Sequence, residues 1–428
     1  MTPRRLLLSA VLVAAAGMVA AAPTLGQQRD GLLTLKGSST VSVWDPLSTD
    51  EILSASSNTR LPLFRYVAVS SRDGKRYSGV IVGQSPQAEN KRATTITTQI
   101  IPLIVTTGNV VTAVDFDTGE FTTIPGQTTF DPTAADTACL TAPNNVPLTL
   151  VQQSPIFQPT DFTFGPTFVG NTQYVDAFQR ANFWQSVADT EYHTLLSPIE
   201  TLSAIHVDAP SGIAMPVAQI GLSGCGMFGT IDFDSFDELL VSTIIPALAA
   251  QGVNSTTLPI FLLHNMGLQI PPFNGGKVLF AGYHGSRKFQ TYAVAEYDSA
   301  GAIRSAVQDV SIVAHEVVEW MNDPFNTNRS PAWGHVGQEV DCQKKLEVAD
   351  PLTGTYIPVT MPNNFTYHPQ ESAFFSWFFG APSIAVNGWF SNNNSFTSDA
   401  GPICRKVLSS SERDDRGLGE REEPRGGP

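Results

Sequence analysis

Residues 315–319, with the sequence HEVVE, form the most informative segment of the chain. They lie in an apolar run over residues 310–321 that contains no glycine or proline, which predicts a helix. On a helix, His315 and Glu319 stand at positions i and i+4, so their side chains leave the same face one turn apart. Zinc hydrolases use this spacing to present two metal ligands. In them the residue after the first ligand, here Glu316, is the general base.

The second ligand of such a motif is usually histidine, and here it is Glu319. A carboxylate oxygen is an acceptable zinc ligand, so the geometry stays possible. The more negative ligand set acidifies bound water less and also suits a harder ion such as Mn or Ca. The alternative is a solvated helix surface. The segment is apolar nearly all round, however, which favours a buried helix whose His and Glu need a partner or a metal.

A catalytic zinc normally has three protein ligands, and Glu339 is the first choice for the third. Asp341 would share a face with Glu339 in an extended segment and is the nearest alternative. Asp323 precedes Pro324 at the end of the predicted helix, where it could bind the metal or act as a turn residue that orients His315. His335 is a further possible ligand, although a loop histidine is the simpler interpretation.

His284 lies in a predicted strand with the sequence GYHG. From there it could reach the cleft and stabilise an oxyanion, or serve as a metal ligand itself. The flanking glycines, Gly282 and Gly285, allow a close backbone approach. The alternative for His284 is a strand histidine without a chemical role, as expected for His193, His206, His264 and His368, which have no motif context.

The elements that precede this helix alternate between strands and helices. Strands are predicted at TITTQIIPLIVTT and LSAIHV, and then at LPIFLLHNM, KVLFAGYHG and TYAVAEYD. Helices are predicted at QYVDAFQRANFWQSV and at FDSFDELLVSTIIPALAAQ, the second with a kink or break at Pro246. This order predicts an α+β, zincin-like fold, in which a twisted mixed sheet backs the metal helix and an edge strand can bind an extended peptide.

The chain divides into four predicted regions. Residues 1–26 have a positive start, an apolar stretch and a small-residue cleavage region, as in an export signal. Residues 27–95 are β-rich, residues 96–408 form the zincin-like domain, and residues 409–428 lack apolar periodicity and are expected to be disordered. Removing the signal changes the net charge from −14 to −16, because it removes Arg4 and Arg5 and no acid. This charge excludes nucleic acid and anionic membranes as expected partners.

The four cysteines are too far apart in sequence for a CxxC metal site. In an oxidising compartment, two disulfides are the default. The expected pairs are Cys342 with Cys404 and Cys139 with Cys225, because short loops close more easily. Free buried thiols are the alternative. A disulfide at Cys342 would hold the acidic segment around Glu339 rigid.

Three segments in succession resemble the EXORDIUM, or phosphate-induced protein, family and its bacterial relatives. They are FAGYHG at 280–285, VAHEVVEWMNDP at 313–324 and EVDC at 339–342, with the strand TYAVAEYD after the first. In that family a GYHS-like strand precedes an HELAE-like helix and then an acidic segment of the form E-x-A-D-x-C. The resemblance covers residues 255–404 and implies a secreted, zincin-like protein without a settled activity.

The sequence therefore predicts a secreted or periplasmic metal-dependent hydrolase that acts on peptides or proteins, with no membrane anchor. Its metal is zinc, with Mn or Ca as alternatives, held by His315, Glu319 and Glu339, while Glu316 and His284 are catalytic. The alternative is a non-catalytic binding or signalling protein on the same fold. A third hypothesis, a carbohydrate-active protein, depends on exposed aromatic residues such as Trp377, Trp389 and Phe390.

Overall fold

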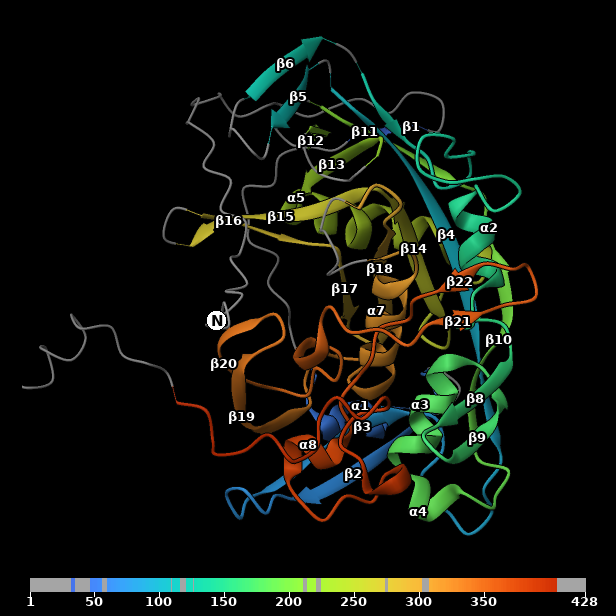
Figure 1. The fold of residues 1–428 in the computed structure, drawn as a ribbon, viewed down its shortest axis with the longest axis vertical. Helices are drawn as coiled ribbons and strands as arrows, with labels where there is room; N and C mark the ends of the chain where they lie inside the picture. The colour runs from blue at the N-terminus through green and yellow to red at the C-terminus, as the bar shows by residue number, and fades with distance from the viewer. Residues whose placement is uncertain are drawn as a thin grey trace, which may run out of the picture.

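The computed structural model describes most of the chain between residues 32 and 405. It covers residues 32–34, 47–55, 60–108, 110–115, 121–125, 127–210, 214–220, 225–273, 276–301 and 308–405. The predicted export signal, residues 1–26, and the predicted disordered tail, residues 409–428, lie outside these ranges. The described chain is mixed α+β, with a curled sheet and few helices, which confirms the predicted class (Figure 1).

The largest sheet has eight strands in the part of the chain that the structure describes, with the path β1-β11-β4-β14-β18-β17 and with β7 and β10 also paired to β4. Its pairs are parallel except β17–β18 and β4–β7, which are antiparallel. The strands are β1 (Leu32–Thr34), β4 (Ala93–Thr107), β7 (Thr129–Phe130), β10 (His193–Thr201), β11 (Ile205–Ala209), β14 (Leu258–His264), β17 (Gly282–Arg287) and β18 (Gln290–Tyr297). The GYHG segment thus lies on β17, at one end of the sheet.

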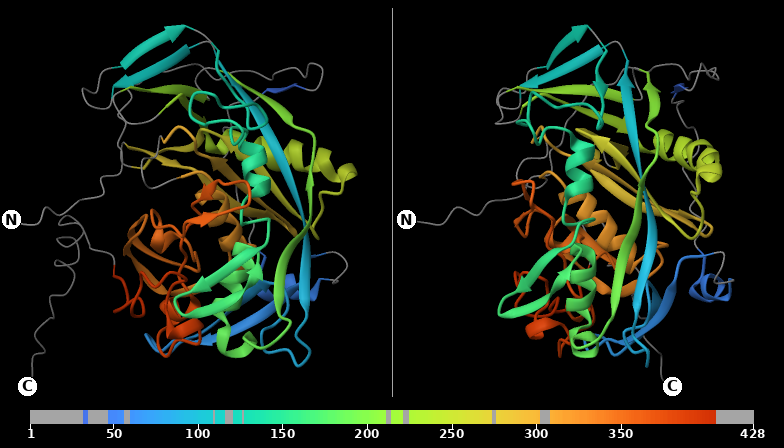
Figure 2. Two further views of the ribbon diagram at one scale, coloured as in Figure 1. Left: turned by 45° about the vertical axis from the view of Figure 1, so that its right-hand side comes forward. Right: turned by 90° about the vertical axis from the view of Figure 1, so that its right-hand side faces the viewer.

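The two faces of this sheet bury two separate hydrophobic cores. Along β14, Ile260 and Leu262 belong to one core, while Phe261 and Leu263 belong to the other. This alternation follows from the two-residue period of a strand, and burial on both faces explains why β14 is apolar throughout. The first core includes the helix that carries the HEVVE segment, and the second includes helix α5, on the opposite side of the sheet (Figure 2).

A second sheet, with six strands among the described residues, lies at the upper end of the molecule, in the order β16-β15-β13-β12-β5-β6 (Figure 1). Its strands are β5 (Val110–Asp115), β6 (Phe121–Pro125), β12 (Ala214–Ile220), β13 (Met227–Asp232), β15 (Met266–Phe273) and β16 (Gly276–Phe280). The remaining strands form hairpins: β2 (Leu63–Val69) with β3 (Arg76–Val82), β8 (Thr160–Phe164) with β9 (Thr167–Thr172), β19 (Arg329–Val336) with β20 (Glu339–Lys345), and β21 (Val359–Thr360) with β22 (Thr366–Tyr367).

The helices are short. They are α1 (Thr49–Ser54), α2 (Pro147–Gln153), α3 (Tyr174–Asn182), α4 (Trp184–Val187), α5 (Phe233–Leu239), α6 (Ile245–Ala247), α7 (Ser311–Asn322) and α8 (Phe375–Phe379). The helix predicted to kink or break at Pro246 continues past this residue, and its regular geometry changes to a π-helical turn, Leu240–Ile244, directly before α6. No helix in the described ranges is long and apolar enough to cross a membrane.

The β-rich N-terminal region packs directly on the side of the large sheet that carries α7. Phe64 on β2 and Ile81 on β3 belong to the same hydrophobic core as α7. Asn328, just beyond α7, accepts a hydrogen bond from the Val80 N–H at 3.0 Å and donates one to the Val80 carbonyl at 2.7 Å. A Cβ on Gly79 would lie 2.0 Å from the Asn328 side chain, so only glycine permits this contact.

Both predicted disulfides are present. Cys139 is bonded to Cys225, and Cys342 to Cys404, so no free cysteine remains in the chain. The second bridge joins β20 to the C-terminal segment near residue 404. It therefore constrains β20, the strand that leads into residues 346–350.

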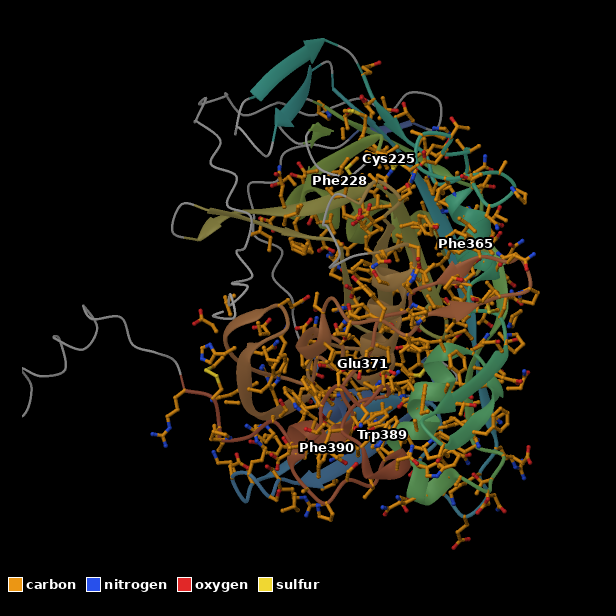
Figure 3. The ribbon with its side chains drawn as sticks, in the orientation of Figure 1. Cys225, Phe228, Phe365, Glu371, Trp389 and Phe390 are labelled. Carbon is orange, nitrogen blue, oxygen red and sulfur yellow. A yellow bond between two sulfur atoms is a disulfide. The ribbon has the colours of Figure 1, made fainter. Side chains whose placement is uncertain are left out.

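The aromatic residues that suggested a carbohydrate-binding surface belong to the core. Trp377 is 4% exposed and stacks on Phe396 with ring centroids 4.8 Å apart. Trp389 and Phe390 are partly buried and pack against the first core, near α8 (Figure 3). The structure therefore gives the carbohydrate hypothesis no exposed aromatic platform at these three residues.

Candidate metal centre

Helix α7 presents His315, Glu316 and Glu319 inside the protein. It spans Ser311–Asn322, as the apolar run predicts, and every one of its residues is buried. It ends where Pro324 disfavours helical geometry at the preceding residue, Asp323. It packs against β17 and β18 on one side and against α3 and β3 on others. Because the helix is enclosed, the side chains of His315, Glu316 and Glu319 must find partners within the protein.

The orientation of the His315 ring is fixed by Gln370. The Gln370 amide nitrogen donates to the Ala349 carbonyl at 2.7 Å, so its oxygen, Oε1, is the atom that faces His315. His315 Nδ1 lies 3.2 Å from that oxygen and must donate its hydrogen to it. The other ring nitrogen, Nε2, faces two carboxylates, with Glu319 Oε2 and Asp350 Oδ1 each 3.3 Å away. A donor on Nδ1 and a ligand atom at Nε2 is the usual arrangement of a metal-binding histidine.

Glu319 connects α7 to the segment that follows β20. Its Oε1 accepts hydrogen bonds from the backbone N–H groups of Ala349 at 3.0 Å and Asp350 at 3.2 Å. Its Oε2 is left to face the histidines. Asp350 is held in turn by the side-chain amides of Gln338 at 2.6 Å and Gln343 at 3.0 Å. The carboxylates around His315 are therefore positioned by hydrogen bonds that leave one oxygen of Glu319 free.

His284 approaches the same cluster from strand β17 and is also oriented. Its Nε2 lies 3.1 Å from the backbone carbonyl of Asp323, which can only accept, so Nε2 carries the hydrogen. Its Nδ1 then faces Glu316 Oε2 at 3.5 Å and Glu319 Oε2 at 3.8 Å. The Asp323 carboxylate accepts from the N–H groups of Thr327 and Asn328. Asp323 is thus a turn residue whose carbonyl orients His284, not His315.

Glu316 contacts His284 and has no hydrogen-bond partner among the described residues, although it is only 4% exposed. The neighbouring strand makes room for it. A Cβ on Gly282 would lie 2.8 Å from Glu316 Oε1 and 2.6 Å from the Ile312 side chain. Gly282 therefore fulfils the expectation of a close approach between the GYHG strand and the helix.

Burial makes the charged forms of these carboxylates costly. It raises the pKa of Glu316 well above its usual range, with repulsion from Glu319 and Asp350 adding to the effect and His315 opposing it. Burial, together with repulsion from Glu319, likewise raises the pKa of Glu347 well above its usual range. A cluster of this kind is stabilised by positive charge placed between the oxygens.

The pKa values of the two histidines are shifted in opposite directions. Burial lowers the pKa of His284 to about 3, so its ring is neutral and Nδ1 is a lone-pair donor. Burial also disfavours the charged form of His315, but Glu319 and Asp350 outweigh it and raise the pKa of His315 well above its usual range. The carboxylates therefore attract positive charge at His315 Nε2, and a divalent cation can supply it in place of a proton.

The spacing of the ligand atoms fits a metal ion. Two buried groups have ligand atoms that all lie within 4.8 Å of one another: His315 with Glu319 and Asp350, and His284 with Glu316 and Glu319. Ligand atoms 2.0–2.2 Å from a tetrahedral zinc are roughly 3.3–3.6 Å apart, close to the 3.3 Å contacts of His315 Nε2. Imidazole nitrogen and carboxylate oxygen suit zinc and manganese.

The third ligand predicted from the sequence, Glu339, belongs to neither group. It is the first residue of β20, and burial together with repulsion from Asp350 raises its pKa to about 7, so it lies near the cluster. The chain turns after β20, and Asp350 takes the place beside His315 and Glu319 that was assigned to Glu339. Asp341 is exposed on β20.

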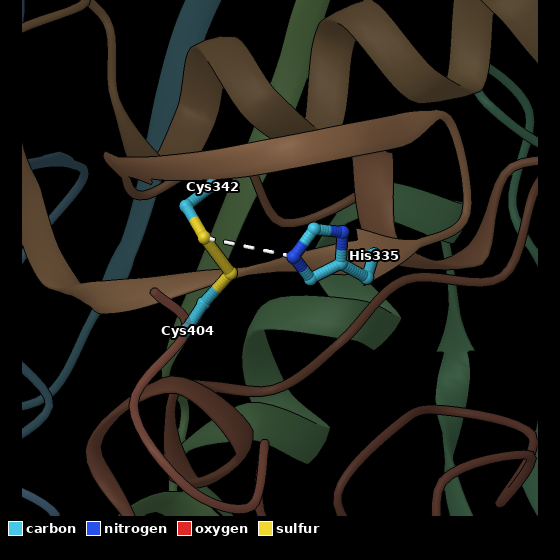
Figure 4. A group of neighbouring side chains, drawn as sticks. All are labelled: His335, Cys342 and Cys404. Carbon is cyan, nitrogen blue, oxygen red and sulfur yellow. Dashed lines mark hydrogen bonds between the residues drawn. A yellow bond between two sulfur atoms is a disulfide. The ribbon is translucent and has the colours of Figure 1, made fainter. Parts of the chain in front are cut away.

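His335, the remaining predicted alternative, lies elsewhere. It is exposed on β19, where its Nε2 is 3.8 Å from the sulfur of Cys342 (Figure 4). His335, Cys342 and Cys404 have the proximity of a metal site, but the two sulfurs are bonded to each other. Because a metal binds thiolates, this group does not offer a metal site while the disulfide is intact.

Three site residues escaped the sequence prediction: Asp350, Glu347 and Gln370. The sequence does contain a signal for Glu347 and Asp350. Residues 347–350 read EVAD, which matches the acidic pattern E-x-A-D of the EXORDIUM family, whereas the prediction placed that pattern at EVDC, residues 339–342. Gln370 stands in no motif. Its role depends on a loop that returns to the helix from beyond β22, which no local pattern reveals.

The remaining histidines are paired with acids or exposed. His193 contacts Asp176 at 2.7 Å, and His368 contacts Asp309 at 2.7 Å. His264 lies 3.3 Å from Asp136, and His206 is exposed on β11.

Comparisons with known proteins do not assign the chain to a family. No protein-family model matches the chain, and neither a curated protein nor a solved structure matches it.

Proposed function

We propose that this protein is a secreted, metal-dependent hydrolase, peptidase-like in its chemistry, in which His315, Glu319 and Asp350 hold a zinc ion and Glu316 is the general base. The observation that carries the proposal is the environment of His315 Nε2. This nitrogen has its hydrogen on the far side of the ring and faces two carboxylate oxygens at 3.3 Å. Two carboxylate oxygens that converge on one ring nitrogen form a position for positive charge, and a divalent cation can occupy it in place of a proton.

The residues around the ion would divide the chemistry among them. The bound ion would supply Lewis acidity, which polarises a carbonyl and makes water a stronger acid. Glu316 is adjacent to the ligand His315 on the helix but lies outside the ligand group of His315, so its carboxylate is available to accept a proton from water and pass it to a leaving amine. Gln370 keeps the hydrogen of His315 on Nδ1, so the Nε2 atom of His315 faces Glu319 and Asp350 and would be available to hold the ion. The backbone N–H groups of Ala349 and Asp350 keep Glu319 in place.

A peptide is the substrate that best fits the surrounding strands. β17 is the terminal strand of the large sheet and bonds to β18 on one side only, among the strands that the structure describes. An extended peptide can add to such an edge through main-chain hydrogen bonds, close to His284. This placement of an antiparallel edge strand beside the helix also supports a zincin-like fold and the resemblance to the EXORDIUM family.

The disulfides support the proposed location of the protein. Two disulfides are characteristic of an oxidising compartment, and they support export of the chain. Manganese or calcium is the alternative to zinc, because the ligand set is rich in carboxylates.

A non-catalytic binding or signalling protein is the second candidate, and one observation favours it. His284, His315, Glu316 and Glu319 are each only 3–5% exposed. A closed coordination sphere is typical of a structural metal, whereas a catalytic metal keeps a position for water. In this case the ion would stabilise the contact between α7 and residues 346–350 and would perform no chemistry.

Activity measurements separate the two candidates. The zinc-loaded protein is incubated with a broad peptide library and an ester panel, and products are detected by mass spectrometry. The proposal predicts cleavage by the wild type and a rate lower by roughly 10²- to 10⁴-fold for Glu316→Gln at unchanged metal binding by His315. Glu339→Gln is the matched control, because it makes the same chemical change at a nearby acid outside the ligand groups.

Two results would overturn the proposal. If the wild type cleaves nothing with Zn, Mn or Ca supplied, the binding-protein candidate replaces the hydrolase. If Glu316→Gln cleaves as fast as the wild type, another residue is the base.

A further inference from the structure

The geometry points to a second divalent cation in the same cluster, bound between His284 on β17 and the carboxylates of Glu316 and Glu319 on α7. We infer that the centre is dinuclear and that Glu319 bridges its two ions. This inference extends the proposed function, because the first ion is the one held by His315, Glu319 and Asp350. It assigns His284 as a metal ligand, the alternative to its role as an oxyanion donor.

The first argument is the orientation of His284. Its Nε2–H is committed to the carbonyl of Asp323, so the nitrogen that faces Glu316 and Glu319 carries a lone pair. A lone pair directed at two carboxylates is repulsive unless a proton or a metal cation lies between them, and a divalent cation neutralises both acids at once. His315 shows the same arrangement toward a different pair of acids. Each histidine thus defines its own cation position.

The second argument is the unpartnered side chain of Glu316. The side chain of Glu316 is 5% exposed, and no described residue forms a hydrogen bond with its carboxylate. Its nearest polar contact is His284 Nδ1 at 3.5 Å. A buried carboxylate without a hydrogen bond is costly, and a directly bound cation removes that cost. Oε2 of Glu316 faces His284, whereas Oε1 lies on the side of Gly282, so one oxygen can bind the ion and the other can accept a proton.

The third argument is the free oxygen of Glu319. Oε1 is occupied by two backbone N–H groups, and Oε2 lies 3.3 Å from His315 Nε2 and 3.8 Å from His284 Nδ1. The same oxygen therefore completes both ligand groups. A shared carboxylate is compatible with ions roughly 3.5–4 Å apart, the separation found in two-metal hydrolase sites.

The balance of charge agrees with two ions. Five carboxylates in the cluster are at most 7% exposed: Glu316, Glu319, Asp323, Glu347 and Asp350. The nearest basic side chain is Lys345, whose Nζ lies 3.8 Å from Glu347. If the five acids are ionised, Lys345 and one divalent ion leave two negative charges uncompensated, whereas two divalent ions leave none. Glu347 Oε2 is buried and has no hydrogen bond. It lies 4.0 Å from His284 Nε2, so a carboxylate oxygen also faces this side of the His284 ring.

Metal counting tests the inference without any assay of activity. The full chain is stripped with a chelator, saturated separately with Zn²⁺ and with Mn²⁺, freed of excess metal and analysed by inductively coupled plasma mass spectrometry. We expect two ions per chain for the wild type and one for His284→Ala. We expect His206→Ala, which removes an exposed histidine from β11, to retain two. Should His284→Ala fail to fold, Glu316→Ala serves as the second variant, with the same expected loss of one ion.

Electron paramagnetic resonance of the manganese form tests whether the two ions are neighbours. Two Mn²⁺ ions that share Glu319 are expected to give a spin-coupled spectrum, which His284→Ala converts to the six-line signal of an isolated ion. One ion per saturated wild-type chain, two ions without coupling, or two ions retained in both site variants would each overturn the inference. A protein that binds two coupled ions and cleaves nothing would contradict the hydrolase and leave the dinuclear centre intact. A protein that binds one ion and cleaves peptides would support the hydrolase and overturn the dinuclear centre.

Discussion

His315 Nδ1 donates a hydrogen bond to Gln370 Oε1 across 3.2 Å, and this contact decides which nitrogen of the ring faces the acids. Because the Gln370 amide nitrogen is bound to the Ala349 carbonyl, the amide cannot turn to offer its N–H groups to His315 instead. The same segment supplies the backbone N–H groups that hold Glu319. One glutamine therefore couples the orientation of the histidine to the position of the loop that carries Asp350.

Replacing Gln370 tests this coupling. Gln370→Leu removes the acceptor for Nδ1–H, and we expect metal affinity to fall by roughly 10- to 100-fold, the usual effect of losing such an outer contact. Gln370→Glu keeps an acceptor toward His315 and should retain most of the affinity that Gln370→Leu loses. Competition titration with a zinc indicator measures both. Equal affinities for the wild type and Gln370→Leu would show that the hydrogen bond does not position the ligand.

Removing His315 should empty the metal position that it shares with Asp350. We expect His315→Ala to lose that ion, and also the increase in melting temperature that saturating metal gives the wild type, because a ligand stabilises only the state that binds it. Metal content and thermal unfolding are measured with and without a chelator, with His206→Ala as the matched control. Unchanged metal content in His315→Ala would refute the assignment of this residue.

Much of the fold can be predicted from local sequence patterns. The apolar run over residues 310–321 predicts α7, since Pro324 fixes its end, and the predicted strands LPIFLLHNM and TYAVAEYD correspond to the buried strands β14 and β18. The surroundings of α3 cannot be predicted in this way. Its sequence is typical of an amphipathic surface helix, yet all its residues are buried. One of its polar side chains, Asn182, accepts a hydrogen bond from the Phe375 N–H, and this contact joins residues far apart in sequence.

The candidate site likewise contains residues that local sequence patterns predict and residues that they do not. The two α7 residues of the His315 group could be predicted because helical spacing alone places them together. Asp350 could not be predicted in that way, because its position depends on the reversal of the chain after β20 and on the hydrogen bonds that residues 349–350 donate to Glu319. Glu339 matches the expected spacing from Glu319, but a spacing cannot specify where a hairpin turns.

The disulfides provide a test of the compartment. Protein isolated from its native location should contain no free thiols when counted under denaturing, non-reducing conditions. Cys342→Ser combined with Cys404→Ser should lower the free energy of unfolding by about 2–4 kcal/mol, because the closed loop of the unfolded chain is released. Urea denaturation of the metal-free proteins measures the difference. Four free thiols in the isolated protein would contradict export to an oxidising compartment.

The His368–Asp309 pair predicts a pH dependence that is independent of the metal ligands. The hydrogen bond to Asp309 raises the pKa of His368 above its unfolded value, despite partial burial. A raised folded pKa stabilises the protein below the unfolded pKa of about 6.5, and this stabilisation is lost as pH rises through the folded pKa. The difference in unfolding free energy between the wild type and His368→Gln should therefore shrink between pH 5 and pH 9. A difference that stays constant with pH would contradict the prediction.

Anomalous X-ray diffraction on crystals of the zinc-loaded protein tests the central claim most directly. Data recorded on both sides of the zinc absorption edge locate the ion without reference to any assumed ligand. The account predicts a peak about 2.0–2.2 Å from Nε2 of His315 and from carboxylate oxygens of Glu319 and Asp350. Saturated crystals with no anomalous peak among these three residues, or with the peak bound elsewhere on the chain, would contradict the account.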